Sequence, residues 1–248
     1  MSRERAYAPG SGETAPVGAA VEPSSVGGWR LERRCGGAQE LHDAAASDPI
    51  DGRALLVQSV QRPALVIGST QQAGDVDEVL LGESGIELAR RRSGGGAVLL
   101  GADDHVWVDL VVPADDPLAE DDVERAAWWV GELWLRVLGL SDLAVEGRAL
   151  VHRRGVSDRP AGAVACFAAL GPGEIAVDGR KVLGVSQRRT RHGARFQCVA
   201  YRRWEPQQLL SLLSVDAAGS AAVGLIDAAA PIVATGWSVE RDLLPALP

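Results

Sequence analysis

The chain has 248 residues, a hydrophobic content of 46%, a net charge of −8 and a sequence pI near 5.1. Its length predicts one domain or a small pair with a sizeable core, and its acidic balance argues against a nucleic-acid partner. No apolar run reaches the roughly 18 residues of a membrane span, and no signal-peptide pattern follows the first arginines. Three widely spaced cysteines argue against a disulfide framework or a zinc site. We therefore expect a cytoplasmic protein without a metal site or a membrane partner.

Residues 1–28 are rich in Gly, Pro, Ser and Ala, which predicts a disordered tail. Apolar periodicity and turn residues then predict, in chain order, a helix at 38–46, strands at 53–60, 64–68 and 106–113, a long helix at 121–140, a helix near 206–213 and a short helix near the C-terminus. The strand at 106–113 alternates, so its apolar face is Val106, Val108, Leu110 and Val112.

The helix at 121–140 is expected to bury one stripe of side chains. The stripe is Val123, Ala127, Val130, Trp134, Val137 and Leu138. The adjacent Trp128 and Trp129 cannot both lie on it, and we expect both to serve in packing.

The segment RRRSGGGAVLL, residues 90–100, places three cations and a serine before three glycines. A glycine run can form a concave array of backbone N–H groups that suits a phosphate or a carboxylate. The spacing fits neither a phosphate-binding P-loop nor a dinucleotide fingerprint. Taken alone, the triplet is equally compatible with a flexible loop.

A second informative segment is GEIAVDGRKVLGVSQRRT, residues 173–190, where Asp178-Gly179 predicts a two-residue hairpin. In that register Lys181 faces Ala176 and shares a face with Leu183, Val185 and, across the ladder, Glu174. A lysine and a carboxylate that point with apolar side chains indicate a functional site, since lysines are seldom buried.

Together these motifs resemble one family. IELARRRSGGGAV (86–98), followed by VDGRKVLGVSQRRT (177–190), is similar to the lipoate–protein ligase branch of the biotin/lipoate attachment enzymes. ALVIGSTQ (64–71) resembles that family's strand ending in glycine and a polar turn. The resemblance extends over roughly residues 55–201. Biotin ligases carry a Gly-Arg alternation instead of the glycine triplet, so the lipoate side is favoured.

The resemblance implies an α+β fold, with a mixed, largely antiparallel sheet flanked by helices, like the catalytic domain of class II tRNA synthetases. It implies one catalytic domain at 29–248 without the accessory C-terminal domain of larger ligases. The activity implied is conversion of lipoate or octanoate with ATP and Mg²⁺ to an acyl adenylate, followed by transfer to a lysine of a lipoyl-domain acceptor protein.

In that ligase Lys181 is the catalytic residue. The residues implied to bind the acyl or adenylate group are Arg91, Ser93, Gly94, Gly95, Gly96, Ala97, Glu174 and Gly184. Fixed cations and donors would stabilise the negative charge of the meeting carboxylate and phosphate. We further expect Val66, Val98 and Val185 to line an apolar slot for the acyl chain.

Other features favour different hypotheses. The family's glycine triplet is usually followed by a His-Asp pair, which this chain lacks. Cys166-Phe167 ahead of Glu174 resembles a sister group, the cysteine-dependent octanoyltransferases, in which a thiolate takes the acyl group from an acyl carrier protein without ATP. Cys166 is also compatible with a small apolar filler of the core. A third hypothesis is a ligand-binding relative that lost catalysis.

The remaining candidates carry weaker signals. The histidines His42, His152 and His192 show no metal-binding spacing, and we expect them to be structural or solvated. The arginines at 188, 189 and 191 form either a solvated strand end or a docking patch for an acidic acceptor. Ser93 has no nearby base to suggest a nucleophile.

Overall fold

The computed structural model describes residues 24–101, 103–157, 160–232 and 237–248. Residues 1–23 of the predicted tail (1–28) lie outside the described residues. Residues 24–26 form a strand and 27–28 the turn that follows it, so regular structure begins earlier than the predicted boundary at residue 29. No helix within the described ranges is both long and apolar enough to cross a membrane.

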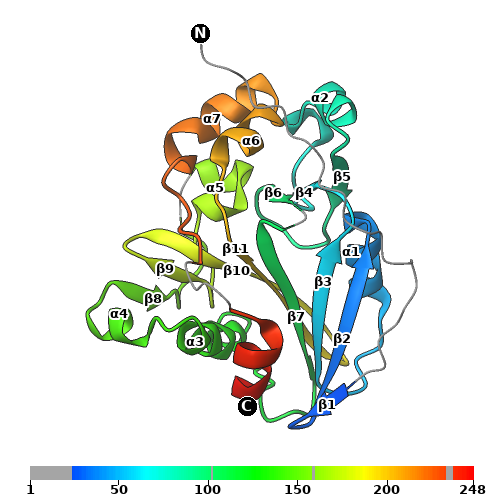
Figure 1. Cartoon of the computed structure of the whole chain (residues 1–248), viewed down its shortest axis with the longest axis vertical. Coiled ribbons are helices and arrows are strands. Elements are labelled where there is room, and N and C mark those ends of the chain that lie inside the picture. Colours follow the sequence, from blue (N-terminus) through cyan, green and yellow to red (C-terminus); the bar gives the residue numbers. More distant parts are fainter. Residues whose placement is uncertain (1–23, 102, 158–159, 233–236) are drawn as a thin grey trace.

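An eight-stranded sheet forms the centre of the molecule (Figure 1). Its strands are β1 (Ser24–Val26), β2 (Trp29–Gly36), β3 (Ala54–Val60), β7 (His105–Pro113), β8 (Ala149–Val151), β9 (Ile175–Val177), β10 (Arg180–Thr190) and β11 (Gly193–Tyr201). Their order is β1-β2-β3-β7-β11-β10-β9-β8. Every neighbouring pair is antiparallel except β2 and β3. The predicted mixed, largely antiparallel sheet is therefore confirmed.

A second sheet has three strands in the order β5-β4-β6. They are β4 (Ala64–Ile67), β5 (Glu87–Arg90) and β6 (Val98–Leu100). The central β4 pairs in parallel with β5 and antiparallel with β6. The glycine triplet is the connection between β5 and β6, so this small sheet fixes both ends of the loop.

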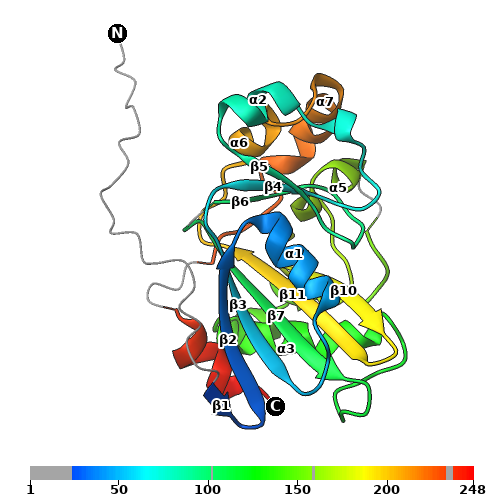
Figure 2. The ribbon, with the colours of Figure 1, turned by 90° about the vertical axis from the view of Figure 1, so that its right-hand side faces the viewer.

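Helices cover both sheets. They are α1 (Ala38–Ser47), α2 (Glu78–Glu83), α3 (Trp128–Val137), α4 (Ser141–Val145), α5 (Pro160–Val164), α6 (Pro206–Ser211) and α7 (Val215–Leu225), with short turns η1 (Ala73–Asp75), η2 (Arg125–Ala127), η3 (Cys166–Ala168), η4 (Val239–Leu243) and η5 (Leu244–Ala246). α1 and α3 lie on opposite faces of the large sheet, and α2, α6 and α7 gather near the small sheet (Figure 2). The α+β class is confirmed.

The predicted alternation of β7 is confirmed. Its apolar face packs against α3 in the main core, with Val108 and Leu110 fully buried. The opposite face carries Trp107 and Asp109, and the Trp107 indole donates to the Asp109 carboxylate at 2.9 Å. Burial raises the pKa of Asp109 above its ordinary value. β7 thus separates a dry core from a face with polar groups.

The predicted long helix begins later than its sequence suggests. Asp122 accepts hydrogen bonds from the backbone N–H groups of residues 124 and 125, both at 2.9 Å, and so starts a 3₁₀ turn ahead of α3. Val123 consequently lies outside the stripe and is 61% exposed. The two tryptophans separate as expected. Trp129 packs edge-on against Phe196, and the Arg153 guanidinium lies over Trp128, with its Cζ 5.0 Å from the ring centre.

Candidate functional site

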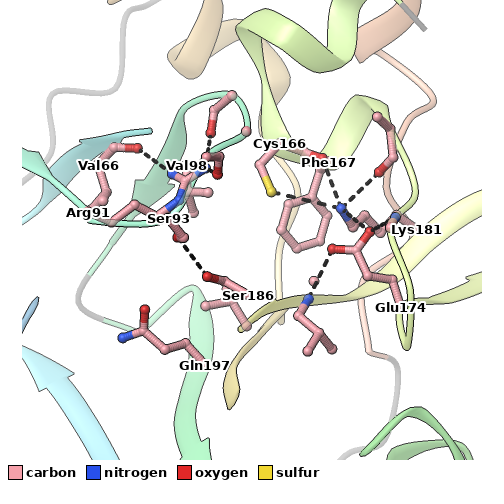
Figure 3. Close-up of a pocket in the computed structure, with 18 of the residues that line it drawn as sticks. Val66, Arg91, Ser93, Val98, Cys166, Phe167, Glu174, Lys181, Ser186 and Gln197 are labelled. Carbon is pink, nitrogen blue, oxygen red and sulfur yellow. Dashed lines mark hydrogen bonds and ion pairs between the residues drawn. The ribbon is translucent and has the colours of Figure 1, made fainter. Parts of the chain in front are cut away.

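A cavity of about 380 Å³ lies between the two sheets, and its size is typical of small-molecule sites. Four segments supply most of its wall: the loop between β5 and β6, the stretch from η3 to the start of β9, residues 181–187 of β10 and the middle of β11. Figure 3 shows that side chains from these segments point toward one another across the cavity. Segments far apart in the sequence therefore build one site.

Arg91 organises the glycine loop. The residue is 5% exposed, and its guanidinium donates from Nη2 to the carbonyls of Gly94 and Gly96 at 2.8 Å each and from Nη1 to the carbonyl of Val66 at 3.2 Å. Gly95 has a φ of +92°, a conformation that side chains disfavour. Arg91 lines the cavity, but the sequence could not show that it holds the loop's own carbonyls.

The three glycines serve different purposes. A Cβ at Gly96 would lie 2.4 Å from the backbone nitrogen of Ala165, so this glycine permits two chain segments to touch. A Cβ at Gly94 would meet no heavy atom of the described chain within 4 Å. Part of the bare backbone is therefore needed for packing, and Gly94 is the position where a ligand could approach.

The close contact at Gly96 brings Cys166 to the site. The backbone N–H of Ala97 donates to the carbonyl of Val164 at 2.7 Å, and the N–H of Cys166 donates to the carbonyl of Ala97 at 3.0 Å. These bonds attach the segment that carries Cys166 directly to the end of the glycine loop. The Cys166 thiol is partly exposed and lines the cavity.

The hairpin that carries Lys181 forms as predicted. Asp178 and Gly179 take φ values of 48° and 78°, and Lys181 pairs with Ala176. The register then shifts between Lys181 and Leu183, so the expectation that Leu183 and Val185 share the lysine's face is wrong. Leu183 and Val185 pack into the core under α3 instead.

Because of this shift, Gly184 faces the site together with Lys181. A Cβ at Gly184 would lie 3.3 Å from the Phe167 ring and 3.7 Å from the lysine's Cε. The backbone of Lys181 is also held on its other side, since its N–H donates to the carbonyl of Ala228 at 2.7 Å and its carbonyl accepts from Ala230 at 2.9 Å.

The side chain of Lys181 is 98% buried and fully engaged. Its Nζ lies 2.6 Å from Glu174 Oε2, 2.8 Å from the carbonyl oxygen of Ala169 and 2.9 Å from that of Cys166. Cys166 Sγ is 3.8 Å away. The ammonium also lies 5.1 Å from the centre of the Phe167 ring. The sequence-based expectation that Lys181 and Glu174 point inward together is confirmed.

The other end of the cavity is apolar. Its wall includes Val66, Val98, Leu100, Trp107 and Val199. Across the sheet Gly184, Val199 and Trp107 are successive partners on β10, β11 and β7. Two strand spacings separate the first from the last, so this floor is about 10 Å long. Such a floor suits an acyl chain that starts near Lys181.

His42 on α1 also lines the cavity, although the sequence gives it no distinguishing signal. Its ring lies 4.7 Å from that of Trp107. Burial, followed by the nearby Arg91 cation, lowers the pKa of His42 to about 4, so the imidazole is neutral near pH 7. On the glycine loop, Ser93 accepts a hydrogen bond from Ser186 at 2.7 Å, which joins the loop to β10.

The other weaker candidates lie outside the cavity. Arg188 donates to the carbonyl of Ala46, and Arg189 donates to that of Asp121 at 3.0 Å, so both bind the protein itself. His152 contacts the carbonyl of Gly155 at the surface. Across the described ranges, no three His, Cys, Asp or Glu side chains gather as a set that could hold a metal ion.

Comparison with known families and structures gives concordant findings. Residues 38–224 match the model of the lipoyl protein ligase A/B catalytic domain. A search of curated proteins found no match.

Many solved structures share the fold, among them the following three. Ta0514 from T. acidophilum with bound lipoic acid is 17% identical, covers 86% of this chain and 79% of its own, and has a TM-score of 0.57. A lipoate–protein ligase A bound with ATP is 18% identical; the match covers 89% of this chain and 81% of the ligase, with a TM-score of 0.58. A bi-partite lipoate protein ligase of Thermoplasma acidophilum, studied with its E2 lipoyl domain, is 16% identical, with 87% and 80% covered and a TM-score of 0.54.

Proposed function

The chain belongs to the lipoyl protein ligase A/B catalytic-domain family, and on that premise we propose that it attaches a lipoyl or octanoyl group to a lysine of a lipoyl-domain acceptor protein. Structures of the same fold bind lipoic acid or are described with an E2 lipoyl domain, which supports this acyl group and this acceptor. Residues 29–248 would act as one catalytic domain.

The position of Cys166 supports a thiol-dependent route. Its sulfur lies in the cavity wall, 3.8 Å from the Lys181 ammonium, which can stabilise negative charge on sulfur. The apolar floor for an acyl chain starts at Gly184, close to the same lysine. A nucleophile, a cation and an acyl slot therefore meet, as covalent acyl transfer requires.

In this route the Cys166 thiolate attacks the carbonyl carbon of an acyl thioester on a carrier such as acyl carrier protein. The new C–S bond forms while the carrier sulfur leaves and takes a proton. The acceptor's neutral lysine amine then attacks the acyl-cysteine, an amide forms, and the Cys166 sulfur leaves as the amine loses a proton. No ATP is consumed, because the thioester is already a good electrophile.

The residues around these atoms have matching roles in the proposal. Ser93, Gly94, Gly95 and Gly96 shape the wall opposite Lys181, and Arg91 keeps that wall in place through the loop carbonyls. Ala97 does not line the cavity; it is buried and attaches the segment of Cys166 to the end of this loop. Gly184 leaves room for the acyl chain beside Phe167. Val66 and Val98 contact the chain farther along, whereas Val185 contributes its backbone.

An ATP-dependent ligase is the second candidate. The Ser-Gly-Gly-Gly run favours it, and a structure of the same fold binds ATP. In that ligase Lys181, Arg91 and the glycine loop would hold the acyl carboxylate and the phosphate of ATP, with Mg²⁺ supplying further positive charge. However, the three N–H groups of Lys181 already donate to protein oxygens, so a phosphate would have to displace one of those partners.

One experiment separates the candidates. The protein is incubated with an apo-lipoyl domain and either an octanoyl-carrier thioester without ATP or lipoate with ATP and Mg²⁺, and the acceptor's mass is measured. We expect the octanoyl mass gain in the first mixture. A gain in the second mixture alone would support the ligase, and no gain in either would support a non-catalytic binder and contradict the proposal.

A further inference from the structure

The short hydrogen bonds of Lys181 go to oxygens, and the cysteine sulfur accepts only a long one. An ammonium has three N–H groups, and three oxygens lie within 2.9 Å of Nζ: a carboxylate oxygen of Glu174 and the carbonyls of Ala169 and Cys166. The sulfur of Cys166, at 3.8 Å, is the fourth neighbour. In this arrangement the lysine's charge interacts electrostatically with the sulfur, which receives none of its short hydrogen bonds.

Glu174 is itself fixed by backbone donors. Its Oε1 accepts from the N–H of Val185 at 3.0 Å, and its Oε2 accepts from the N–H of Gly171 at 2.6 Å (Figure 3). The side chain is 95% buried. The carboxylate therefore ties β10 to the loop before β9, and both its oxygens are held by the protein rather than turned toward a ligand.

We infer that Glu174 is a positioning residue for acyl transfer, which fixes the Lys181 ammonium beside Cys166 and offsets its charge until the acyl donor arrives. This assigns Glu174 a role through Lys181 in place of the direct contact with the acyl group that the family resemblance implies. The inference rests on the proposed function, because it concerns the thiol that carries the acyl group.

The inference predicts opposite electrostatic effects of the two partners on the thiol. Loss of the carboxylate leaves the lysine's charge unbalanced and stabilises the thiolate, whereas loss of the lysine leaves a carboxylate nearby and destabilises it. Tyr201, a titratable group that interacts with the thiol, and Arg91, which lines the same cavity, are present in both variants.

The test measures the rate at which iodoacetamide alkylates Cys166 between about pH 6 and pH 9, since the thiolate is the reactive form. Cys35→Ser is the parent protein, because Cys35 is exposed and would react as well. We expect Glu174→Gln to lower the pH midpoint and raise the rate at pH 7 roughly three- to tenfold, and Lys181→Met to raise the midpoint and lower that rate by a similar factor.

Two further variants control for structural damage. Glu132→Gln removes a carboxylate that is 46% exposed and pairs with Arg153 at the surface, so it should leave the midpoint unchanged. A glutamine at 174 places an NH₂ group against a backbone N–H and so weakens one bond. If that variant does not fold, the double variant Glu174→Gln/Lys181→Met replaces it, and its midpoint should return toward the parent value.

Shifts in the same direction for the two single variants, or a double variant that matches Lys181→Met, would overturn the inference. These outcomes are distinct from failure of the proposed function, because alkylation needs no acyl donor. If the wild-type protein transfers no acyl group while the two variants shift the alkylation midpoint in opposite directions, only the proposed function is contradicted.

Discussion

Replacement of Lys181 by methionine should destabilise the fold strongly. The change removes the Lys181 cation, which is 2% exposed, and leaves the Glu174 carboxylate, which is 5% exposed, without its counter-charge. It also removes the donor of the Ala169 and Cys166 carbonyls. Breaking a buried ion pair from one side typically costs about 3–5 kcal/mol. Methionine retains much of the apolar stem against Phe167, so little of the cost should come from a cavity.

A double-mutant cycle separates this cost from general damage. With Glu174→Gln also present, no buried charge is left unpaired, so the double variant should be more stable than the sum of the two single changes predicts, by roughly 1–3 kcal/mol. The total stability of a domain is about 5–15 kcal/mol, which makes the effect easy to measure.

The assay is urea unfolding followed by the fluorescence of the chain's seven tryptophans, with free energies compared at equal m-values. Glu132→Gln, which breaks an exposed pair, serves as the control and should cost less than about 1 kcal/mol. A cost of less than about 1 kcal/mol for Lys181→Met, or fully additive changes in the cycle, would refute the assignment of a buried, charged pair.

Two further outcomes follow from the cavity wall. Gly94→Val should leave thermal unfolding unchanged, because a Cβ there meets no protein atom within 4 Å, but it should weaken binding of octanoate at least about tenfold by filling space that the ligand would occupy. Gly96→Val should instead destabilise the protein, since its Cβ would overlap the 164–165 backbone. Equal effects of the two variants on stability would contradict this division of roles. The pKa of His42 is about 4 against 6.5 for the free group, so as pH falls from about 6.5 to 4 the unfolded chain gains a proton that the folded one excludes, and stability falls by up to about 3 kcal/mol. His42→Gln should remove this part of the fall in urea-derived stability and leave the part that comes from His105, whose pKa burial also lowers to about 4. Parallel curves for variant and wild type would show that His42 is not shielded.

The sequence predicted those parts of the site that depend on local geometry. Asp178-Gly179 set the hairpin, and the hairpin brought Lys181 and Glu174 to one side because strand side chains alternate. The alternation of β7 was predicted for the same reason. These features need only neighbouring residues, so the sequence pattern was sufficient.

Features that depend on distant segments could not be predicted. The register shift after Lys181 accompanies backbone pairing with residues 228–230, more than 40 positions away. Arg91 binds carbonyls that come together only when the loop closes. The sequence does not decide whether Cys166 is a core filler or a nucleophile, because its contact with Ala97 arises from the close approach at Gly96.

Intact-mass spectrometry of the protein shows whether Cys166 carries the acyl group. The wild-type protein is mixed with octanoyl-carrier thioester without ATP, sampled over time, and then chased with an apo-lipoyl domain. We expect one octanoyl adduct on Cys166 that forms at least as fast as overall turnover and passes to the acceptor lysine, and no adduct with Cys166→Ser. Octanoylation of the acceptor by Cys166→Ser at the wild-type rate, or a requirement for ATP, would contradict the account.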